Sequence, residues 1–368
     1  MKSSIRTLDV AYNVFCRFEQ VAEVKHYPGL VALYGLAQLA DASGNPAIRE
    51  KAQTLLRRYP DHVDHPRYNF ESYRVGGNGR AYLVMRGMDD EGKALLRQYA
   101  EITMQAPVDK AGIQCMPAKE KLPLQQVWID VITATTPFMV MAGVALGEDQ
   151  YIAYGADQCF KMYDLFENPE NHLLHQARGF MDDVNAISQD HWSRGNGWGI
   201  IGLADMLQYL PQEDPRWQEA ARRMQRHAQA LARYQTERGL WRQSIACDLA
   251  WEESSGTGLI AYSLGVGIRM GVLAPETFLP VLQKAIQGLA DYCLHDDFST
   301  ELSCHGCLCP GKGKAKGTLQ AYLCDVRAYK NEPHSFGPIM LAMVEAHRNG
   351  LKEIEWKEEM FSHVKVYR

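Results

Sequence analysis

A repeated pair of helical patterns constrains the fold of this chain more than any other feature of its sequence. Residues 29–59, "GLVALYGLAQLADASGNPAIREKAQTLLRRY", give an apolar helix, a Ser-Gly-Asn-Pro turn and an amphipathic helix. The proline stands where the first turn of a helix tolerates it. The same order of patterns returns in residues 137–163, 198–231 and 258–292. The chain is therefore predicted to be built from helical hairpins, each with one small-residue-rich helix and one more polar helix.

Small residues mark the predicted inner helices at a rough period. Five glycines follow one another at intervals of 52, 56, 59 and 63 residues: Gly35, Gly87, Gly143, Gly202 and Gly265. A sixth apolar helix is predicted over residues 336–350, "FGPIMLAMVEAHRNG". Such a period indicates a repeat architecture, in which small residues let inner helices approach closely while polar helices face water.

Six hairpins are predicted to close into an all-α fold, an (α/α)6 toroid or six-hairpin barrel, with an open helical solenoid as the alternative. No Pro/Ser-rich linker interrupts the pattern, so residues 1–368 are predicted to form a single domain. The best strand candidate is "HVKVYR" at residues 363–368. In such a toroid the loops that lead into the inner helices meet at one mouth, where a site is expected.

Charge and cysteine content narrow the choice of partner and compartment. The formal net charge is −5, and the one basic cluster is "GKGKAKG" at residues 311–317, so nucleic acid is not expected as a partner. This basic loop is predicted to be solvated, or else to form a lid that attracts an anionic substrate.

Residues 131–147 are apolar but short for a membrane span, and they contain three threonines and a proline, which favours a buried core helix. No signal peptide is recognised, and nine scattered cysteines favour reduced thiols in a cytoplasmic protein.

The ten residues "DHWSRGNGWG", 190–199, combine two tryptophans, an arginine and a histidine with three glycines. A structural turn needs the glycines but not the aromatic and basic side chains. Asn196 is predicted to cap a helix that starts near Gly197. Trp192 and Trp198 are predicted to form a sugar platform, because aromatic rings stack on the apolar face of a pyranose. Arg194 would offer its planar fork to a carboxylate, so an acidic sugar would use both kinds of group.

Asp130 in "VWIDVIT" is an acid flanked by aliphatic residues near the start of a predicted helix. Burial among such neighbours raises a carboxyl pKa, which suits a general acid working near neutral pH. The alternative is an aspartate that is simply satisfied at the helix start. Trp128 lies two positions away and is expected in the same wall.

Three further stretches are weaker candidates. The "NHLLHQARGF" stretch (171–180) contributes His172 and His175, which could equally be surface residues. The glycines around Asn78 favour a tight turn with Asn78 as a cap over a phosphate-binding loop, because no Lys-Ser/Thr pair follows. The "CHGCLC" stretch (304–309) lacks a standard zinc spacing, so no metal and no other cofactor is expected.

Five motifs occur in an order that resembles glycoside hydrolase families 88 and 105. They are "VWID", "HLLHQARGF", "HWSRGNGWG", "GLW" and "NEPHSFGPIMLA", and the resemblance runs from about Val21 to Asn349. It implies an (α/α)6 barrel that needs no metal. It also implies oligosaccharide substrates that carry a C4=C5 unsaturated uronic acid at the non-reducing end.

Carried over position by position, the resemblance makes Asp130 the acid/base residue. It makes the following residues part of the substrate pocket: Trp128, His175, Trp192, Arg194 and Trp198. Asn78 and His334 are also expected to contact the substrate. Two positions depart from the family pattern. Arg74 stands where a second aspartate is common, and "AKEK" (118–121) stands where a Trp-His pair is common. Arg74 is therefore also expected to contact the substrate.

A single carboxyl group suffices for the implied chemistry. Protonation of the enol ether at C4 places oxocarbenium charge on C5, the ionised Asp130 then takes a proton from the attacking water, and the hemiketal opens. Ordinary hydrolysis of an intact uronide would instead need a second carboxylate; the candidates are Asp182, Asp183 and Asp190. A non-catalytic sugar-binding toroid is the alternative outside the enzymes. The sequence leaves the sugar preference and the oligomeric state open.

Overall fold

Six inner helices form a closed ring. The computed structural model describes residues 2–24, 27–59, 77–116 and 125–357. Within these ranges each inner helix packs against the next, and the last packs against the first. In ring order they are α2 (Tyr27–Ser43), α4 (Gly77–Met85), α6 (Val131–Leu146), α8 (Ser193–Tyr209), α10 (Ser254–Arg269) and α13 (Phe336–Arg348). The closed (α/α)6 toroid is therefore confirmed, and the open solenoid is excluded.

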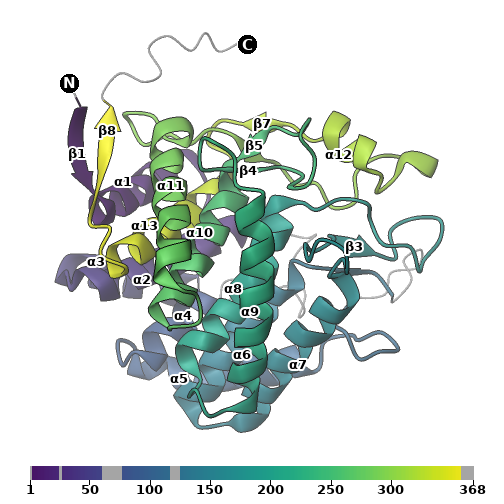
Figure 1. Cartoon of the computed structure of the whole chain (residues 1–368). Helices are drawn as coiled ribbons and strands as arrows, with labels where there is room; N and C mark the ends of the chain where they lie inside the picture. The colour runs from purple at the N-terminus through teal and green to yellow at the C-terminus, as the bar shows by residue number, and fades with distance from the viewer. Residues whose placement is uncertain (1, 25–26, 60–76, 117–124, 358–368) are drawn as a thin grey trace.

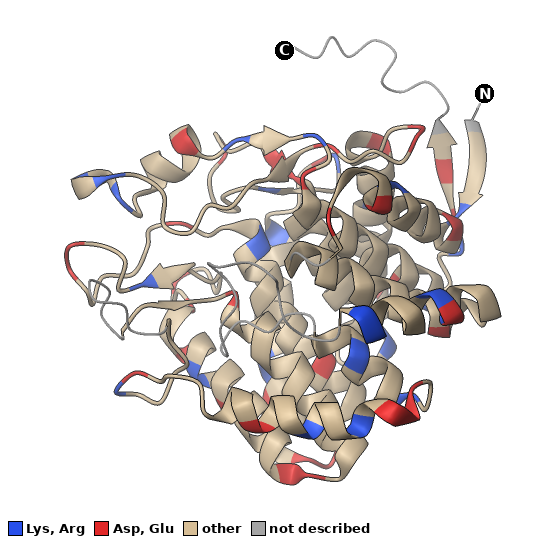
Figure 2. Ribbon diagram, turned by 180° about the vertical axis from the view of Figure 1, so that it is seen from behind, with Lys and Arg blue, Asp and Glu red and all other residues tan. Residues whose placement is uncertain are grey.

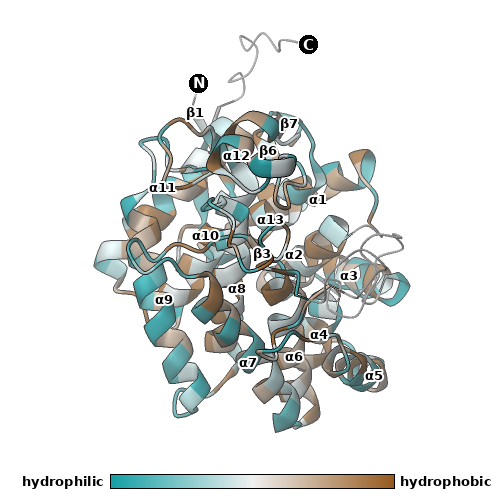
Figure 3. Ribbon diagram, turned by 90° about the vertical axis from the view of Figure 1, so that its right-hand side faces the viewer, coloured by the Kyte–Doolittle hydropathy of each residue, from teal (hydrophilic) through white to brown (hydrophobic). Residues whose placement is uncertain are grey.

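Six outer helices surround this ring (Figure 1). They are α1 (Thr7–Val21), α3 (Pro46–Arg58), α5 (Lys93–Met104), α7 (Asp149–Phe166), α9 (Pro215–Arg233) and α11 (Pro275–Cys293). The outer helix α9 buries one face only, whereas α8 is buried along nearly its whole length. Figure 3 shows this difference as hydrophilic colour on α9 and apolar colour on α8. Acidic and basic residues are interspersed over the ribbon in Figure 2.

The two ends of the chain make the sixth hairpin together. Helix α13 packs against α1, and strand β1 (Lys2–Arg6) pairs antiparallel with β8 (Glu353–Lys357). The sequence analysis identified the inner helix of this hairpin but not its outer partner. Strands β1 and β8 lie side by side in Figure 1 for this reason. The strand candidate at 363–368 lies outside the described residues, and the single-domain assignment of residues 1–368 stays a prediction.

Glycines permit close contact between inner helices, as expected. A Cβ added at Gly202 of α8 would lie 2.4 Å from a side-chain carbon of Ile132 on α6. A Cβ at Gly258 of α10 would lie 2.6 Å from the backbone carbonyl carbon of Pro338 on α13. Gly87 departs from the predicted pattern, because α4 ends at Met85 and Gly87 occupies the following turn with φ +67°. Its role is the left-handed backbone conformation that glycine adopts without strain.

The apolar stretch 131–147 is a buried inner helix, as predicted. Residues 131–143 of α6 are all buried. Across the described ranges no helix is long and apolar enough to cross a membrane.

Short strands lie at the end of the ring where the inner helices begin. Three antiparallel pairs precede or flank inner helices there: β2 (Val127–Trp128) with β3 (Ala177–Arg178), β4 (Trp241–Arg242) with β5 (Glu252–Glu253), and β6 (Ser303–Cys304) with β7 (Ala328–Tyr329). The remaining short elements are α12 (Leu319–Asp325) and the 3-10 turns η2 (Asp90–Gly92), η3 (Gly313–Ala315) and η4 (Pro333–Ser335). These pairs were not predicted, because two-residue strands leave no periodic signal.

Candidate active site

The amino ends of the six inner helices meet at one mouth, and each carries a polar side chain. These residues are Tyr27, Asn78, Asp130, Arg194, Glu253 and His334. The unpaired N–H groups of a helix start give it partial positive charge. The convergence of six such ends makes the mouth a favourable environment for an anionic ligand.

Asp130 immediately precedes α6 and is half-buried. Its Oδ2 is buried and has no hydrogen-bond partner in the described structure. Burial raises the pKa of Asp130 to about 7, and the negative charge of Asp190 adds to this effect, whereas Arg194 and the Trp198 indole oppose it. A carboxyl group with this pKa can carry a proton near neutral pH and can also release it, which a general acid/base requires.

Asp190 is the only one of the three candidate second carboxylates that is buried. Its Oδ2 accepts a hydrogen bond of 2.9 Å from the Trp192 backbone N–H, while its Oδ1 is buried without a partner in the described structure. Burial raises its pKa as well. Asp182 and Asp183 are exposed.

Asn196 does not cap α8, contrary to the sequence prediction. The helix begins at Ser193, so Asn196 lies inside its first turn. Its Nδ2 donates to the carbonyl groups of Leu174 (3.0 Å) and Trp192 (2.9 Å), and its Oδ1 accepts from the Leu174 N–H at 2.8 Å. The side chain therefore fastens the loop that carries His175 to the start of α8.

Arg194 reaches the mouth but is only 1 % exposed. Its Nη1 donates to Ser255 Oγ (3.0 Å) and to the Cys304 carbonyl (2.6 Å), and its Nη2 donates to the His305 carbonyl (3.2 Å). The guanidinium also stacks on the Trp192 ring, 4.5 Å from its centroid. From the sequence, the guanidinium of Arg194 was expected to face the substrate. In the structure both of its terminal nitrogens face protein acceptors.

The three predicted tryptophans are buried around this region. Trp128 lies on β2 and meets Phe180 edge-on, with ring centroids 6.3 Å apart. Trp192 lies under the Arg194 guanidinium, and Trp198 lies close enough to Asp130 to influence its pKa. The indole Nε1 atoms of Trp192 and Trp198 are buried without a partner in the described ranges.

His175 is half-buried and borders Asp190. Its Nδ1 lies 2.8 Å from the Asp190 carbonyl oxygen, and its ring is 4.5 Å from that of His191. The sequence analysis did not select His191, whose pKa is lowered to about 4 by burial and by His175. His172 points elsewhere, since its Nδ1 contacts Glu167 at 2.8 Å.

Of the remaining predicted substrate contacts, Asn78 and His334 lie in the described part of the chain and Arg74 does not. Asn78 is buried in α4 and donates to the Thr133 carbonyl at 3.0 Å, so it links α4 to α6 and is not a cap. The Nδ1 of His334 lies 2.7 Å from Oε1 of Glu332, and its Nε2 contacts the hydroxyl of Tyr27. Arg74 and residues 118–121 lie outside the described residues.

Two buried glutamates were missed by the sequence analysis. Glu253 caps α10 and accepts from the backbone N–H groups of Ser255 and Gly256, from Ser193 Oγ and from the Cys304 N–H. An acidic residue directly before "SSG" at a helix start was the available signal. Glu332 is 5 % exposed and its pKa lies well below its usual range, because His334, His305 and Arg194 favour its charge.

The cysteine-rich stretch contributes to packing at this end. Cys304, Cys307 and Cys309 are buried and free. In the described part of the chain, no group of three or more His, Cys, Asp or Glu residues is arranged to hold a metal ion.

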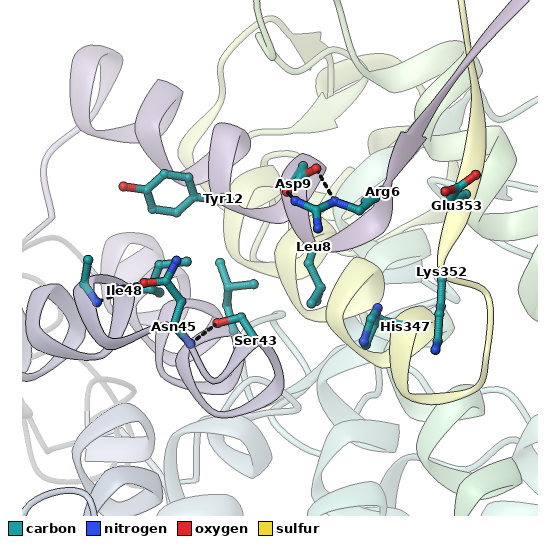
Figure 4. Close-up of a pocket in the computed structure, with 12 residues that line it drawn as sticks. Arg6, Leu8, Asp9, Tyr12, Ser43, Asn45, Ile48, His347, Lys352 and Glu353 are labelled. Carbon is teal, nitrogen blue, oxygen red and sulfur yellow. Dashed lines mark hydrogen bonds and ion pairs between the residues drawn. The ribbon is translucent and has the colours of Figure 1, made fainter.

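A separate cavity of about 510 Å³ lies at the opposite end of the ring (Figure 4). It is bordered by Ser43 at the carboxyl end of α2, by His347 near the carboxyl end of α13, and by Arg6 and Asp9, which pair with each other. None of the residues predicted for the site lines it.

The closed ring of helical hairpins carries at its mouth a carboxyl group whose raised pKa suits general acid/base catalysis, and the comparison with known families assigns this toroid to the glycoside hydrolases. The chain belongs to Glycosyl Hydrolase Family 88, whose family model matches residues 10–350. The family membership inferred from the motifs is thus confirmed.

Relatives and solved structures agree with this membership. The chain is 26 % identical over 270 residues to the unsaturated rhamnogalacturonyl hydrolase YesR of Bacillus subtilis, covering 72 % of this chain and 75 % of the relative. It is 33 % identical over 108 residues to an unsaturated 3S-rhamnoglycuronyl hydrolase of Formosa agariphila, a match that spans 29 % of this chain and only 28 % of that relative. A solved structure of a possible GH105 member from Salmonella enterica has the same fold, with TM-score 0.79, 18 % identity and 94 % of both chains covered.

Proposed function

We propose that this protein removes a C4=C5 unsaturated uronic acid from the non-reducing end of lyase-generated oligosaccharides. The observation that carries the proposal is the state of Asp130, a half-buried acid at the mouth. Its Oδ2 is buried without a hydrogen-bond partner among the described residues, and its pKa is raised to about 7. The names of the two relatives support the substrate class. No metal or cofactor is required, and the cytoplasmic location stays a prediction.

The reaction uses one carboxyl group twice. Protonated Asp130 delivers its proton to C4 of the enol ether, and positive charge develops on C5 and the ring oxygen. The resulting carboxylate then accepts a proton from the water that attacks C5. The hemiketal formed at C5 opens, and the glycosidic bond is lost. A pKa near the working pH serves both transfers.

Three predicted pocket residues lie in this part of the mouth. Trp198 lies beside it, Trp128 forms the wall on β2, and His175 is bound to the Asp190 carbonyl at 2.8 Å. Arg194 is proposed to act mainly by supplying fixed positive charge and by positioning residues 304–305. Asn78, His334 and Arg74 stay proposed substrate contacts.

A second candidate function is hydrolysis of an intact uronide, favoured by the buried carboxyl of Asp190. Loss of ultraviolet absorbance distinguishes the two reactions, because only the unsaturated uronide has a conjugated enol ether. Wild-type protein is expected to abolish the absorbance of a lyase-generated disaccharide, and Asp130→Asn to leave it unchanged. Release of sugar from a saturated uronide without an absorbance change would favour the second candidate, and binding without turnover would indicate a sugar-binding toroid.

A further inference from the structure

An anionic sugar needs a cation at the mouth, and Arg194 is already engaged. Its terminal nitrogens donate to Ser255 Oγ and to two backbone carbonyls. Its charge faces the buried carboxylate of Glu253, with Nη1 3.9 Å from Oε1. Releasing this guanidinium to a ligand would leave the two backbone carbonyls without this donor and would remove the cation that faces Glu253, which is unfavourable inside a buried site.

His305 contacts this buried pair through its backbone. Its backbone carbonyl accepts from Arg194 Nη2 at 3.2 Å, yet its side chain is 72 % exposed. The imidazole Nδ1 lies 3.6 Å from Oε1 of Glu332. No hydrogen-bond partner of Nε2 is found among the described residues, and the exposure of the side chain leaves this nitrogen accessible to a ligand.

Tyr329 provides an apolar surface beside this imidazole. The two rings meet edge-on with centroids 5.9 Å apart, and Tyr329 is 50 % exposed. Pairing of β6 with β7 fixes this arrangement, because Ser303 is opposite Tyr329 and His305 follows the end of β6. A cation next to an exposed aromatic ring is an arrangement suited to an acidic sugar.

We propose that the protonated imidazole of His305, and not the guanidinium of Arg194, receives the carboxylate of the uronyl group, with Tyr329 as the flanking ring. This inference rests on the proposed function. Arg194 then acts as a positioning residue, because its hydrogen bonds to the carbonyls of Cys304 and His305 fix the backbone that carries the imidazole.

The charges around His305 set the pH range of this contact. Glu332 raises the pKa of His305, while burial and the charge of Arg194 lower it. Glu332 itself is ionised and also contacts His334 and Ser303, and Tyr329 faces the ring from β7. The cation is present below the pKa of His305 and is lost as the pH rises through it, so KM for an anionic substrate should rise with pH.

The test compares KM for a lyase-generated unsaturated disaccharide with KM for its methyl ester. His305→Gln should raise KM for the acid roughly 5- to 10-fold at pH 6, with kcat within about 2-fold, and should leave KM for the ester unchanged. His305→Lys should restore the low KM for the acid and extend it to higher pH, which a merely structural role of His305 would not produce. Lys284→Gln removes an exposed cation from the outer helix α11 and is the control, with no change expected.

The outcomes separate this inference from the proposed function. If wild-type protein turns over the disaccharide but His305→Gln keeps the wild-type KM and its pH dependence, His305 is not the carboxylate receptor. An equal rise in KM for Lys284→Gln would also overturn the inference, because the effect would then be a diffuse one of surface charge. Absence of any absorbance loss with wild-type protein would instead reject the proposed function.

Discussion

Arg194 Nη1 donates a 2.6 Å hydrogen bond to the carbonyl oxygen of Cys304, 110 residues later in the chain. This bond ties the start of α8 to the end of β6, and Glu253 at the start of α10 accepts from the Cys304 N–H at 3.0 Å. A single buried cation therefore fixes three segments of the mouth. Residues that bind at the surface of the mouth depend on this buried layer for their positions.

Removal of Arg194 is accordingly expected to destabilise the protein. Arg194→Ala leaves Glu253 buried without its cation, and breaking a buried pair in this way costs about 3–5 kcal/mol. Thermal melting should show a decrease in Tm of about 4–6 °C for a chain of 368 residues. Arg222→Ala is the control, since Arg222 is exposed and pairs only with nearby Glu219. An unchanged Tm with a large loss of kcat/KM would return Arg194 to the role of substrate ligand.

Replacement of the proposed acid should separate catalysis from folding. Asp130→Asn keeps the shape of the side chain and removes its proton, so kcat should fall at least about 10²-fold. Circular dichroism and melting should remain those of a folded protein. Asp183→Asn changes an exposed acid and should leave kcat unaltered. Near-native turnover by a folded Asp130→Asn protein is incompatible with the mechanism.

The raised pKa of Asp130 predicts how both kcat/KM and the free energy of unfolding change with pH. The active form is protonated, so kcat/KM should decline as the pH rises above about 7. The pKa is raised on folding from 3.8, so the stability linked to this proton is present at low pH and is lost as the pH rises from about 4 through 7. Denaturant unfolding should therefore show Asp130→Asn gaining stability relative to wild type between pH 5 and pH 8. A constant difference across that range would contradict the assigned shift.

The contact between α10 and α13 predicts a packing effect. An added methyl group at Gly258 would lie 2.6 Å from a backbone carbon of Pro338, which cannot move aside without shifting α13. Gly258→Ala should lower the free energy of unfolding by about 1–3 kcal/mol or more. Gly306→Ala, where a Cβ would meet nothing within 4 Å, should have little effect on stability.

Activity is expected to survive exhaustive chelation. The proposed reaction uses only a carboxyl group and water, and the described residues contain no group of three metal-ligating side chains. The rate should be equal before and after treatment with a chelator. Loss of activity that zinc restores would require a new assignment for Cys304, Cys307 and Cys309.

The sequence by itself determined the helical hairpins and the candidate acid, whereas closure of the ring was decided by the tertiary structure. Apolar periodicity and the positions of turn residues are local properties. Residues 29–59 therefore predict a helical hairpin independently of the rest of the chain. An aspartate among aliphatic residues at a helix start is likewise visible locally, and Asp130 does stand before α6 with a raised pKa. These features depend on neighbours within a few residues along the chain.

Only the tertiary structure decided which partner each polar side chain has. The sequence shows that Arg194 and Asn196 are polar, but their acceptors come from residues 255, 304 and 305 and from residue 174, brought together by ring closure. The pairing of β1 with β8 and of α1 with α13 likewise joins opposite ends of the chain. Hydrogen bonds are short and directional, so whether Arg194 faces a ligand or the scaffold depends on atomic positions that hydrophobic patterning does not specify.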